Sequence, residues 1–271
     1  MMALEGLRGK IQGDVLLDAE SRARYSFAEC IYRVAPAGVV LPASREDVLE
    51  VLSCARREGV PVTARGSGTA VAGQALGSGI ILDFSRYLSR ILEFRPEEGW
   101  IRVEPGMVLA DLNRLLSAHS VRFAPDPASG NVCTLGGMIA NNAGGPRSLR
   151  YGPTRSNVRS LTVALADGEM FETRSFSREE LSARPGGCQE EIARQLVKKV
   201  DSRRPALLAR TPRVKRLSSG YDLIGSAGGD TIDLARLLVG SEGTLALTLD
   251  ARLALTPLAK AKATALVWFR D

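Results

Sequence analysis

Three glycine-rich segments, far apart in the chain, constrain this protein more than any other feature. They lie at residues 65–73, 125–145 and 240–244. Glycine lets a backbone approach a ligand closely and permits positive φ, so clustered amides can point at phosphate oxygens. A single loop of this kind is compatible with an ordinary turn. Three of them, each containing Ser, Thr or Asn, predict a long phosphate-bearing ligand held mainly by backbone atoms.

The composition is that of a folded globular protein. Of the 271 residues 45% are hydrophobic, no run of 18 apolar residues occurs, and the first 13 residues lack the apolar stretch of a signal peptide. The cysteines at 30, 54, 133 and 188 are too widely spaced for the usual zinc or iron–sulfur motifs. We therefore expect free thiols, no metal site and no transmembrane segment. The expected location is the cytoplasm, either free or peripheral to the inner face of the membrane.

The charge balance predicts small anionic ligands rather than nucleic acid. The chain carries 36 basic and 30 acidic residues, and the basic residues are mostly arginines spread along its whole length. No basic run is interleaved with aromatic residues, so we expect no nucleic-acid binding. The net charge of +6 is interpreted as attraction toward anionic ligands. The arginines of segment 203–216 are assigned to an exposed loop.

A β-α-β unit is predicted before the first glycine loop. Strands are expected at 38–42 and 60–64, with a helix between them that starts after Ser44 and ends at Gly59. This unit places loop 65–73 at the carboxyl end of a strand, where ligands of open α/β sheets commonly bind. The loop does not match the nicotinamide-dinucleotide fingerprint, because the third glycine is missing and no helix of suitable periodicity follows.

The rest of the chain is predicted to combine short strands with helices. Strands are expected at 80–83, 91–94, 100–104, 161–165, 170–173 and 263–269, and helices at 105–119, 178–184 and 188–202. Asp167-Gly168 is interpreted as the turn of a hairpin and nothing more. The last strand has no predicted partner, which we interpret as the start of a further domain.

Several motifs follow one another in a characteristic order. They are residues 34–42, 65–71, Glu104-Pro105-Gly106, Pro125-Asp126-Pro127, 134–145, Tyr151-Gly152, Ala166-Asp167-Gly168 and 239–244. Together they resemble the FAD-binding (PCMH-type) domain of the vanillyl-alcohol oxidase/p-cresol methylhydroxylase superfamily. Within it, the chain is most similar to the glycolate oxidase and D-lactate dehydrogenase branch of FAD-linked oxidases. The resemblance covers roughly residues 20–260.

The resemblance implies a fold class and a domain organisation. The fold is an α+β, two-subdomain FAD-binding PCMH-type fold, with a small α/β subdomain, a larger mixed or antiparallel-sheet subdomain with helices, and no cap domain. The chain then divides into a lead-in at 1–33, the FAD-binding domain at 34–258 and the start of a substrate or cap domain at 259–271. The motif at 218–223 is similar to large members that fuse the flavin domain to a carboxyl-terminal iron–sulfur module.

The resemblance also implies which residues hold FAD. Backbone amides of residues 66–70 would bind the pyrophosphate, residues between Asp126 and Asn141 would follow the ribityl chain and the flavin edge, and Val163 would meet the adenine. The full expected set is Arg65, Gly66, Ser67, Gly68, Thr69, Ala70, Val71, Pro125, Asp126, Ser129, Thr134, Gly136, Gly137, Ile139, Asn141, Asn142, Gly144, Gly145, Tyr151, Gly152, Val163, Glu242, Gly243 and Thr244.

The attachment of FAD is expected to be non-covalent. Relatives that bind FAD covalently use a His or Cys, often beside the pyrophosphate loop, and segment 65–73 contains neither. His119, the only histidine, is interpreted as a capping or surface residue, and Cys133 as a packing residue. The arginines at 147, 150 and 155 are compatible both with pairing to phosphate or an anionic substrate and with a solvated face.

In the relatives, hydride passes from the α-carbon of a 2-hydroxy acid to the flavin while a base takes the hydroxyl proton. The resemblance therefore implies an FAD-dependent 2-hydroxy-acid dehydrogenase of the D-lactate or glycolate type. The catalytic base is unknown, because relatives supply it mainly from a second domain. We expect a partner chain or a missing domain that carries the cap and the iron–sulfur module. The alternatives are a reductase similar to UDP-N-acetylenolpyruvoylglucosamine reductase, and a non-catalytic FAD-binding subunit or remnant.

Overall fold

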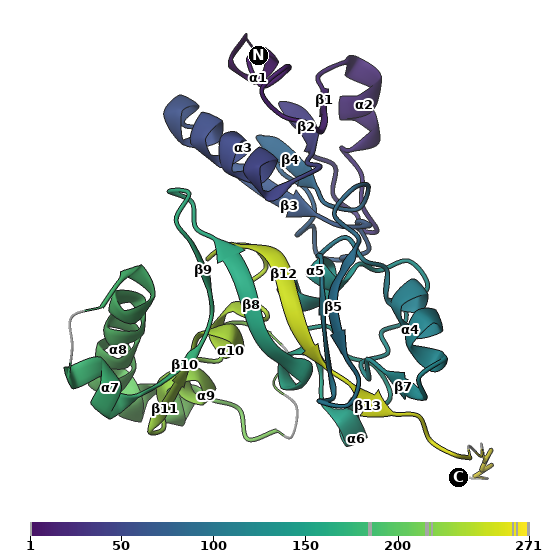
Figure 1. Ribbon diagram of the computed structural model, residues 1–271, viewed down its shortest axis with the longest axis vertical. Coiled ribbons are helices and arrows are strands. Elements are labelled where there is room, and N and C mark those ends of the chain that lie inside the picture. The colour runs from purple at the N-terminus through teal and green to yellow at the C-terminus, as the bar shows by residue number, and fades with distance from the viewer. Residues whose placement is uncertain are drawn as a thin grey trace.

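The computed structural model describes residues 2–183, 186–214, 217, 219–261, 263 and 265–269. In Figure 1 an α/β unit lies at the top, the larger sheet in the centre and a helical lobe at the lower left; the larger sheet has five strands. This arrangement confirms the predicted α+β class with a small α/β subdomain and a larger subdomain built on an antiparallel sheet.

The α/β unit contains the N-terminal third of the chain. Its elements are α1 (Met2–Glu5), β1 (Asp14–Leu16), α2 (Ala19–Arg24), β2 (Gly38–Leu41), α3 (Arg45–Glu58), β3 (Val62–Arg65) and β4 (Ile80–Asp83). The strand order is β1-β2-β4-β3, in which β2, β4 and β3 are parallel and β1 is an antiparallel edge strand. The parallel strands direct their carboxyl ends toward the central sheet, so loop 65–73 lies between the two subdomains.

The ends of α3 are specified by local sequence. Ser44 Oγ accepts a hydrogen bond from the Asp47 amide (3.1 Å), and Gly59 ends the helix in the left-handed conformation with φ 64°. The buried Asp47 carboxylate also accepts hydrogen bonds from the amides of Gln12 and Gly13. The predicted helix and both of its ends are therefore confirmed.

The central sheet is antiparallel throughout. Its strands are β5 (Ile91–Arg95), β6 (Trp100–Val103), β8 (Val158–Ala164), β9 (Met170–Glu172) and β12 (Leu247–Ala254), in the order β5-β6-β12-β8-β9. The chain between β6 and β8 forms α4 (Leu109–Ser117), β7 (Val121–Arg122), α5 (Leu135–Ala140), α6 (Ser148–Tyr151) and the 3₁₀ turn η1 (Thr154–Asn157); β13 (Thr256–Pro257) pairs with β7. The core of this subdomain packs α4 and α5 against the sheet through Leu112, Met138 and Leu161, all almost fully buried.

The helical lobe is inserted between β9 and β12. It comprises β10 (Ser175–Ser177), α7 (Arg178–Ala183), α8 (Cys188–Arg210), α9 (Leu223–Ala227), β11 (Thr231–Asp233) and α10 (Leu234–Leu238). The lobe has a core of its own around Phe176, Val200 and Ile232, each at most 1% exposed.

Two predicted helix boundaries were wrong for tertiary reasons. The helix expected from Pro105 begins at Leu109, because Pro105 O accepts the Gly136 amide and Gly106 donates to Leu88 O, so these residues are bonded to neighbouring segments. The loop expected at 203–216 is helical as far as Arg210, and Lys215 and Arg216 lie outside the described residues.

The strand expected at 263–269 is also wrong for the residues that can be assessed. Residues 263 and 265–269 are not part of any strand, and Trp268 is 88% exposed. Thr264 lies outside the described part of the chain.

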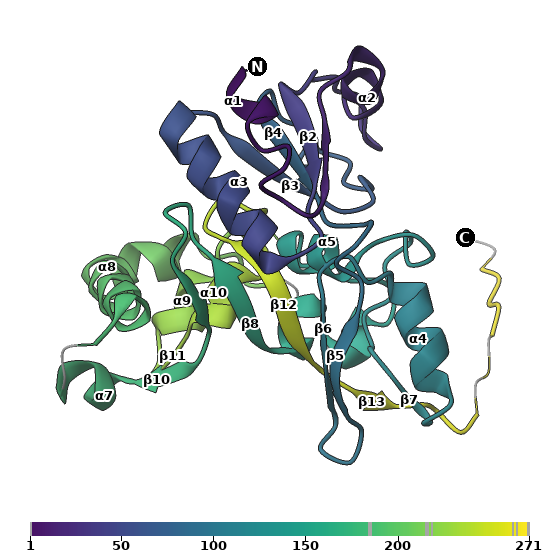
Figure 2. The same cartoon turned by 45° about the horizontal axis from the view of Figure 1, so that its top comes forward.

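A buried ion cluster joins the α/β unit to the central sheet. Asp250 on β12 is 1% exposed and pairs with Arg45 at the start of α3. Its second partner is Arg102 on β6 (Nε to Oδ1, 2.6 Å), which also donates to the Thr162 hydroxyl (2.7 Å). Figure 2 shows α3 beside the end of the central sheet, where this contact forms. Because breaking a buried pair leaves an uncompensated charge, the cluster favours one arrangement of the two subdomains.

Candidate functional site

The first glycine loop leaves its backbone donors unused. Among the described residues, no acceptor is bonded to the amides of residues 67–71. Gly68 is buried and has φ 74°, and its carbonyl accepts the Glu29 amide (3.0 Å). Because buried amides in folded proteins nearly always have partners, the unsatisfied amide of the buried Gly68 indicates a ligand that supplies an acceptor, and the neighbouring free amides can serve the same ligand.

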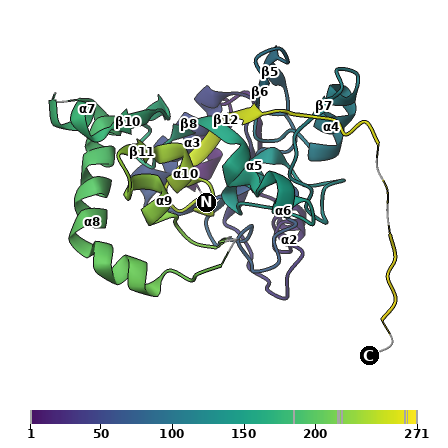
Figure 3. The ribbon, with the colours of Figure 1, turned by 90° about the horizontal axis from the view of Figure 1, so that it is seen from below.

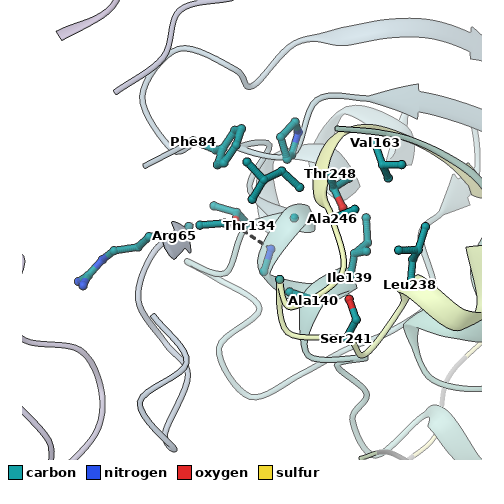
Figure 4. Close-up of a pocket in the computed structure, with 17 residues that line it drawn as sticks. Arg65, Phe84, Thr134, Ile139, Ala140, Val163, Leu238, Ser241, Ala246 and Thr248 are labelled. Carbon is teal, nitrogen blue, oxygen red and sulfur yellow. Dashed lines mark hydrogen bonds between the residues drawn. The ribbon is translucent and has the colours of Figure 1, made fainter. Parts of the chain in front are cut away.

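Arg65 contributes its backbone to the site and directs its side chain elsewhere. Figure 4 shows the guanidinium extending away from the other lining residues. It donates to the carbonyls of Tyr25 and Ala75, and burial lowers its pKa. Tyr25 donates to Asp83 Oδ2 (2.6 Å), and its pKa is raised, chiefly by burial and then by that bond. These contacts hold the two ends of the loop in place.

The second glycine segment satisfies its own backbone. Thr134 caps α5 by accepting the Gly137 amide on Oγ1 (3.3 Å), and the amide of Leu135 is bonded to Met107 O (2.8 Å). A side chain on Gly136 would stand 2.7 Å from Pro105 Cβ, so this glycine allows α5 to pack against the segment after β6. The first amides of α5 are therefore not available as ligand donors.

The third glycine segment closes the site from the other side. The amides of Gly240 and Glu242 donate to Ile139 O and Ala140 O, which fixes the segment to the end of α5. Glu242 has φ 53°, uncommon for a non-glycine residue, and its carboxylate accepts Gln74 Nε2 (3.2 Å). This bond links the first glycine loop to the third across the site.

The three segments enclose one groove at the junction of the two subdomains. It consists of two hollows of about 570 and 670 Å³, counted with the part open to solvent, which share Ala64, Gly66, Thr134, Gly137, Ala140 and Gly243. In Figure 4 the apolar wall of the first hollow is formed by Phe84, Val163 and Ile139.

Most of the residues expected at the site do line the groove. They are Arg65, Gly66, Ser67, Gly68, Thr69, Ala70, Ser129, Thr134, Gly136, Gly137, Ile139, Asn141, Val163, Glu242 and Gly243. They come from β3, α5, β8 and the connecting loops, which are distant in sequence. The structure thus brings the three glycine segments together, as the spacing of the motifs predicts.

Other expected residues lie outside the two hollows. They are Val71, Pro125, Asp126, Asn142, Gly144, Gly145, Tyr151, Gly152 and Thr244. Asp126 instead pairs with Arg147 (3.1 Å), and the Asn142 Oδ1 accepts the Arg155 amide (2.9 Å). Asp126 and Asn142 thus connect the loops around the groove.

Sequence reasoning missed several groove residues. They are Ala64, Gln74, Ala75, Phe84, Pro105, Met138, Ala140, Ala143, Leu238, Ser241, Ala246, Leu247 and Thr248. Ser241 and Pro105 belong to motifs that the sequence singled out, so a signal existed for them. Phe84 and Leu247 are apolar residues at strand ends, and nothing in the sequence separates them from core residues.

The reactive side chains are placed as follows. Cys133 lines the second hollow but is 4% exposed, and burial raises the pKa of its thiol. His119 lies away from the groove and contacts the Phe94 ring edge-on, with 4.7 Å between the ring centroids. Within the described ranges, no three His, Cys, Asp or Glu side chains gather where a metal ion could be held.

The arginines at 147, 150 and 155 do not line the groove. Arg150 lies over the Tyr151 ring, and Arg155 donates to Val239 O (2.6 Å). Burial lowers the pKa of Arg155. The three side chains therefore serve loop packing in this structure.

The fold and the groove agree with comparisons to known proteins. The chain belongs to the FAD binding domain family, whose sequence signature matches residues 36–174. FAD is therefore its cofactor, and the unused amides of the first glycine loop fit the acceptor oxygens of a pyrophosphate.

The relatives in sequence carry the names of dehydrogenases and oxidases of hydroxy acids. D-2-hydroxyglutarate dehydrogenase of Escherichia coli (strain K12) is 37% identical over 258 residues, which cover 92% of this chain and 25% of that protein. Glycolate oxidase subunit GlcD of Bacillus subtilis (strain 168) is 30% identical over 242 residues, covering 89% of this chain and 41% of that subunit. The chain thus spans about a quarter of the length of the D-2-hydroxyglutarate dehydrogenases that it matches.

Solved structures share the fold. Alkyldihydroxyacetonephosphate synthase matches with a TM-score of 0.67 at 19% identity, over 96% of this chain and 41% of that chain. Physcomitrella patens BBE-like 1 matches with a TM-score of 0.66 at 14% identity, over 94% of this chain and 44% of that chain. None of the helices in the described ranges is both long and apolar enough to cross a membrane.

Proposed function

We propose that this chain is the flavin-binding part of an FAD-dependent 2-hydroxy-acid dehydrogenase. The observation that carries the proposal is the 37% identity to D-2-hydroxyglutarate dehydrogenase over 92% of the chain. The match to glycolate oxidase subunit GlcD supports the same substrate class, a small acid with a hydroxyl on its α-carbon.

The groove suggests how FAD is oriented. The pyrophosphate would lie against the amides of residues 67–70, which line the second hollow beside the part that the two hollows share. The adenine end occupies the hollow with Phe84 and Val163, and the ribityl chain and flavin follow the hollow with Ser129 and Asn141. Binding is non-covalent, because the loop has no His or Cys and the buried Cys133 thiol has a raised pKa, which disfavours the nucleophilic thiolate.

The chemistry divides between cofactor and protein. Bound FAD accepts a hydride from the α-carbon of the substrate. The residues of this chain position the cofactor, and the Gln74–Glu242 bond closes the groove over it. Among the described residues that line the groove there is no histidine, and Glu242 is the only carboxylate. We therefore place the catalytic base outside these 271 residues, on a further domain or partner chain that also carries the cap and the iron–sulfur module.

The proposal also includes the domain organisation of the chain and the location of the protein in the cell. The FAD-binding domain comprises residues 34–258, after a lead-in at 1–33, and residues 259–271 begin the substrate domain. The protein works in the cytoplasm, peripheral to the inner face of the membrane. The net charge of +6 supports this location, because the cytoplasmic leaflet attracts basic surfaces.

The test begins with the purified chain and added FAD. We expect a yellow protein that releases its flavin into the supernatant on acid precipitation. Dye-linked oxidation of D-2-hydroxyglutarate, D-lactate and glycolate is then measured for the FAD-loaded chain, alone and with the polypeptide encoded beside it. Turnover should be absent for the chain alone. Without groups that orient the substrate, the activation free energy rises by about 7 kcal/mol or more.

Three outcomes would contradict parts of the proposal. Failure to take up FAD would remove the cofactor assignment. Flavin retained in the acid precipitate would show covalent attachment. Rapid turnover by the isolated chain would place the base within residues 1–271.

A further inference from the structure

The whole net charge of the protein resides in one short segment. Residues 192–214 contain seven Lys and Arg and one acidic residue, Asp201, which is a net charge of +6. The other 248 residues contain 29 basic and 29 acidic residues and are neutral. The positive charge is therefore a local property of α8 and the residues that follow it.

The second half of α8 is almost unsupported by the rest of the molecule. From Asp201 to Val214 every residue is exposed except Leu207, which packs on the core of the lobe with Leu196 and Val200. Figure 3 shows α8 along the outer edge of the molecule, away from α5, and residues 188–210 do not line the groove. A surface contact made there leaves the groove accessible.

Several cations of this segment are exposed and lack acidic partners. Lys199, Arg203 and Arg210 repeat at the same spacing as Leu196, Val200 and Leu207, so they form one stripe along a flank of the helix. We refer to these three residues as the basic stripe. None of them, nor Lys198 or Arg213, has an ion pair with an acidic residue of the described chain.

The only acidic residue of the segment is neutralised. Asp201 is paired with Arg178 of α7 (2.6 Å). The exposed half of α8 therefore presents cations without competing carboxylates.

The segment carries no side chain that could stack on a base. Residues 192–214 contain no aromatic residue, so the segment lacks the stacking groups that single-stranded nucleic-acid sites use. Exposed cations without acidic partners on a projecting helix are suited to the phosphates of an anionic lipid surface.

We propose that the exposed half of α8 and the residues that follow it, from Lys198 to Val214, form a docking surface for anionic membrane lipids. The Lys and Arg side chains of the basic stripe contact the lipid phosphates. This inference rests on the peripheral location proposed above and identifies the surface responsible for it. It does not depend on the substrate or on the position of the catalytic base.

The experiment measures sedimentation of the FAD-loaded protein with vesicles. We expect binding to phosphatidylcholine vesicles that contain phosphatidylglycerol, weakening as salt is raised, and none to pure phosphatidylcholine. Lys199→Glu/Arg203→Glu/Arg210→Glu should weaken binding roughly a hundredfold or more, since each Lys or Arg near the surface contributes about 1 kcal/mol.

The matched control makes the same change of charge elsewhere. Arg8, Arg24 and Arg56 are exposed residues of the α/β unit, and their replacement by Glu should leave much of the binding intact. The neutral variant Lys199→Gln/Arg203→Gln/Arg210→Gln, with smaller changes to the helix, should show an intermediate loss. FAD content of every variant reports whether the fold is retained.

The outcomes separate this inference from the proposed function. Equal losses in the α8 variant and the control would mean that total charge, not this surface, drives binding. Native-like vesicle binding by both α8 triple variants would also overturn the inference while leaving the FAD proposal untouched. No binding of the native protein to anionic vesicles would overturn both this surface and the peripheral location.

Discussion

Glycine has different roles in the first and second glycine segments: it leaves amides free for a ligand in the first, and it allows close packing against the protein in the second. Residues 67–71 keep their amides free of partners in the described chain, around a buried Gly68 with φ 74°. In α5 the first amides are bonded to Met107 O, Pro105 O and Thr134 Oγ1, and the backbone has no spare donor there. One segment is open toward a ligand and the other is packed against the protein.

The difference teaches how a glycine cluster should be interpreted. A side chain on Gly136 would collide with Pro105, and a side chain on Gly66 would collide with Thr134. At both positions the glycine is required by packing against another segment. A Cβ added to Gly137, next to Gly136, would have only Thr134 Oγ1 nearby, at 3.3 Å, and Gly137 lines the groove. Adjacent glycines in one motif thus have separate roles, which substitutions can distinguish.

The largest effect on cofactor binding is expected from Gly68→Val. A non-glycine residue in the left-handed conformation costs about 1–2 kcal/mol, more when β-branched, and the new side chain would stand 2.6 Å from the Arg65 guanidinium. The free amides would be misaligned, so FAD affinity should fall at least about tenfold in a flavin fluorescence titration. Gly59→Val, with φ 64° at the end of α3, is the matched control and should lower the melting temperature with little effect on affinity.

The next comparison is between the neighbours in α5. Gly137→Val should weaken FAD binding several-fold while leaving stability nearly unchanged, because valine is no worse than glycine in a helix. His119→Ala should leave FAD affinity unchanged, because this residue lies away from the groove. Gly136→Ala should destabilise the protein by about 1–3 kcal/mol through overpacking against Pro105, with normal affinity in the folded fraction. Thermal unfolding with and without FAD measures both stability and FAD affinity. A loss of affinity in Gly136→Ala together with a loss of stability in Gly137→Val would show that the two roles are exchanged.

The smallest effect is expected from Cys133→Ala. The side chain is buried between the core of the central subdomain and the second hollow, and its thiol has a pKa raised by burial. Loss of the sulfur should cost on the order of 1 kcal/mol of stability and leave flavin content unchanged across neutral pH. Loss of flavin that parallels loss of a covalent adduct in mass spectrometry would refute non-covalent binding.

Local sequence was sufficient for elements whose boundaries are encoded in a few residues. Helix α3 could be predicted to both ends, because Ser44 and Gly59 act on the turns next to them. The position of the first glycine loop also followed, since a strand that feeds a loop places that loop at the sheet edge. The order of the motifs was enough to indicate the family and its cofactor.

Elements that depend on distant partners could not be predicted in this way. The backbone of Pro105 is bonded to α5, about 30 residues away, so the helix after it starts later than its apolar pattern indicates. Helix α8 continues beyond the predicted end, where Leu207 packs against the core of the helical lobe, and no local pattern reveals this contact.

For this protein, the sequence by itself determined the three glycine segments, the α/β unit and the class of cofactor, because glycine content, caps and strand–loop order act over short distances. Only the tertiary structure decided which glycines face the groove and which face another segment, since that depends on atoms such as Pro105 Cβ and Thr134 Oγ1 approaching from elsewhere. It also decided that the cations of α8 share one exposed flank, because burial of Leu196 and Val200 fixes the rotation of the helix.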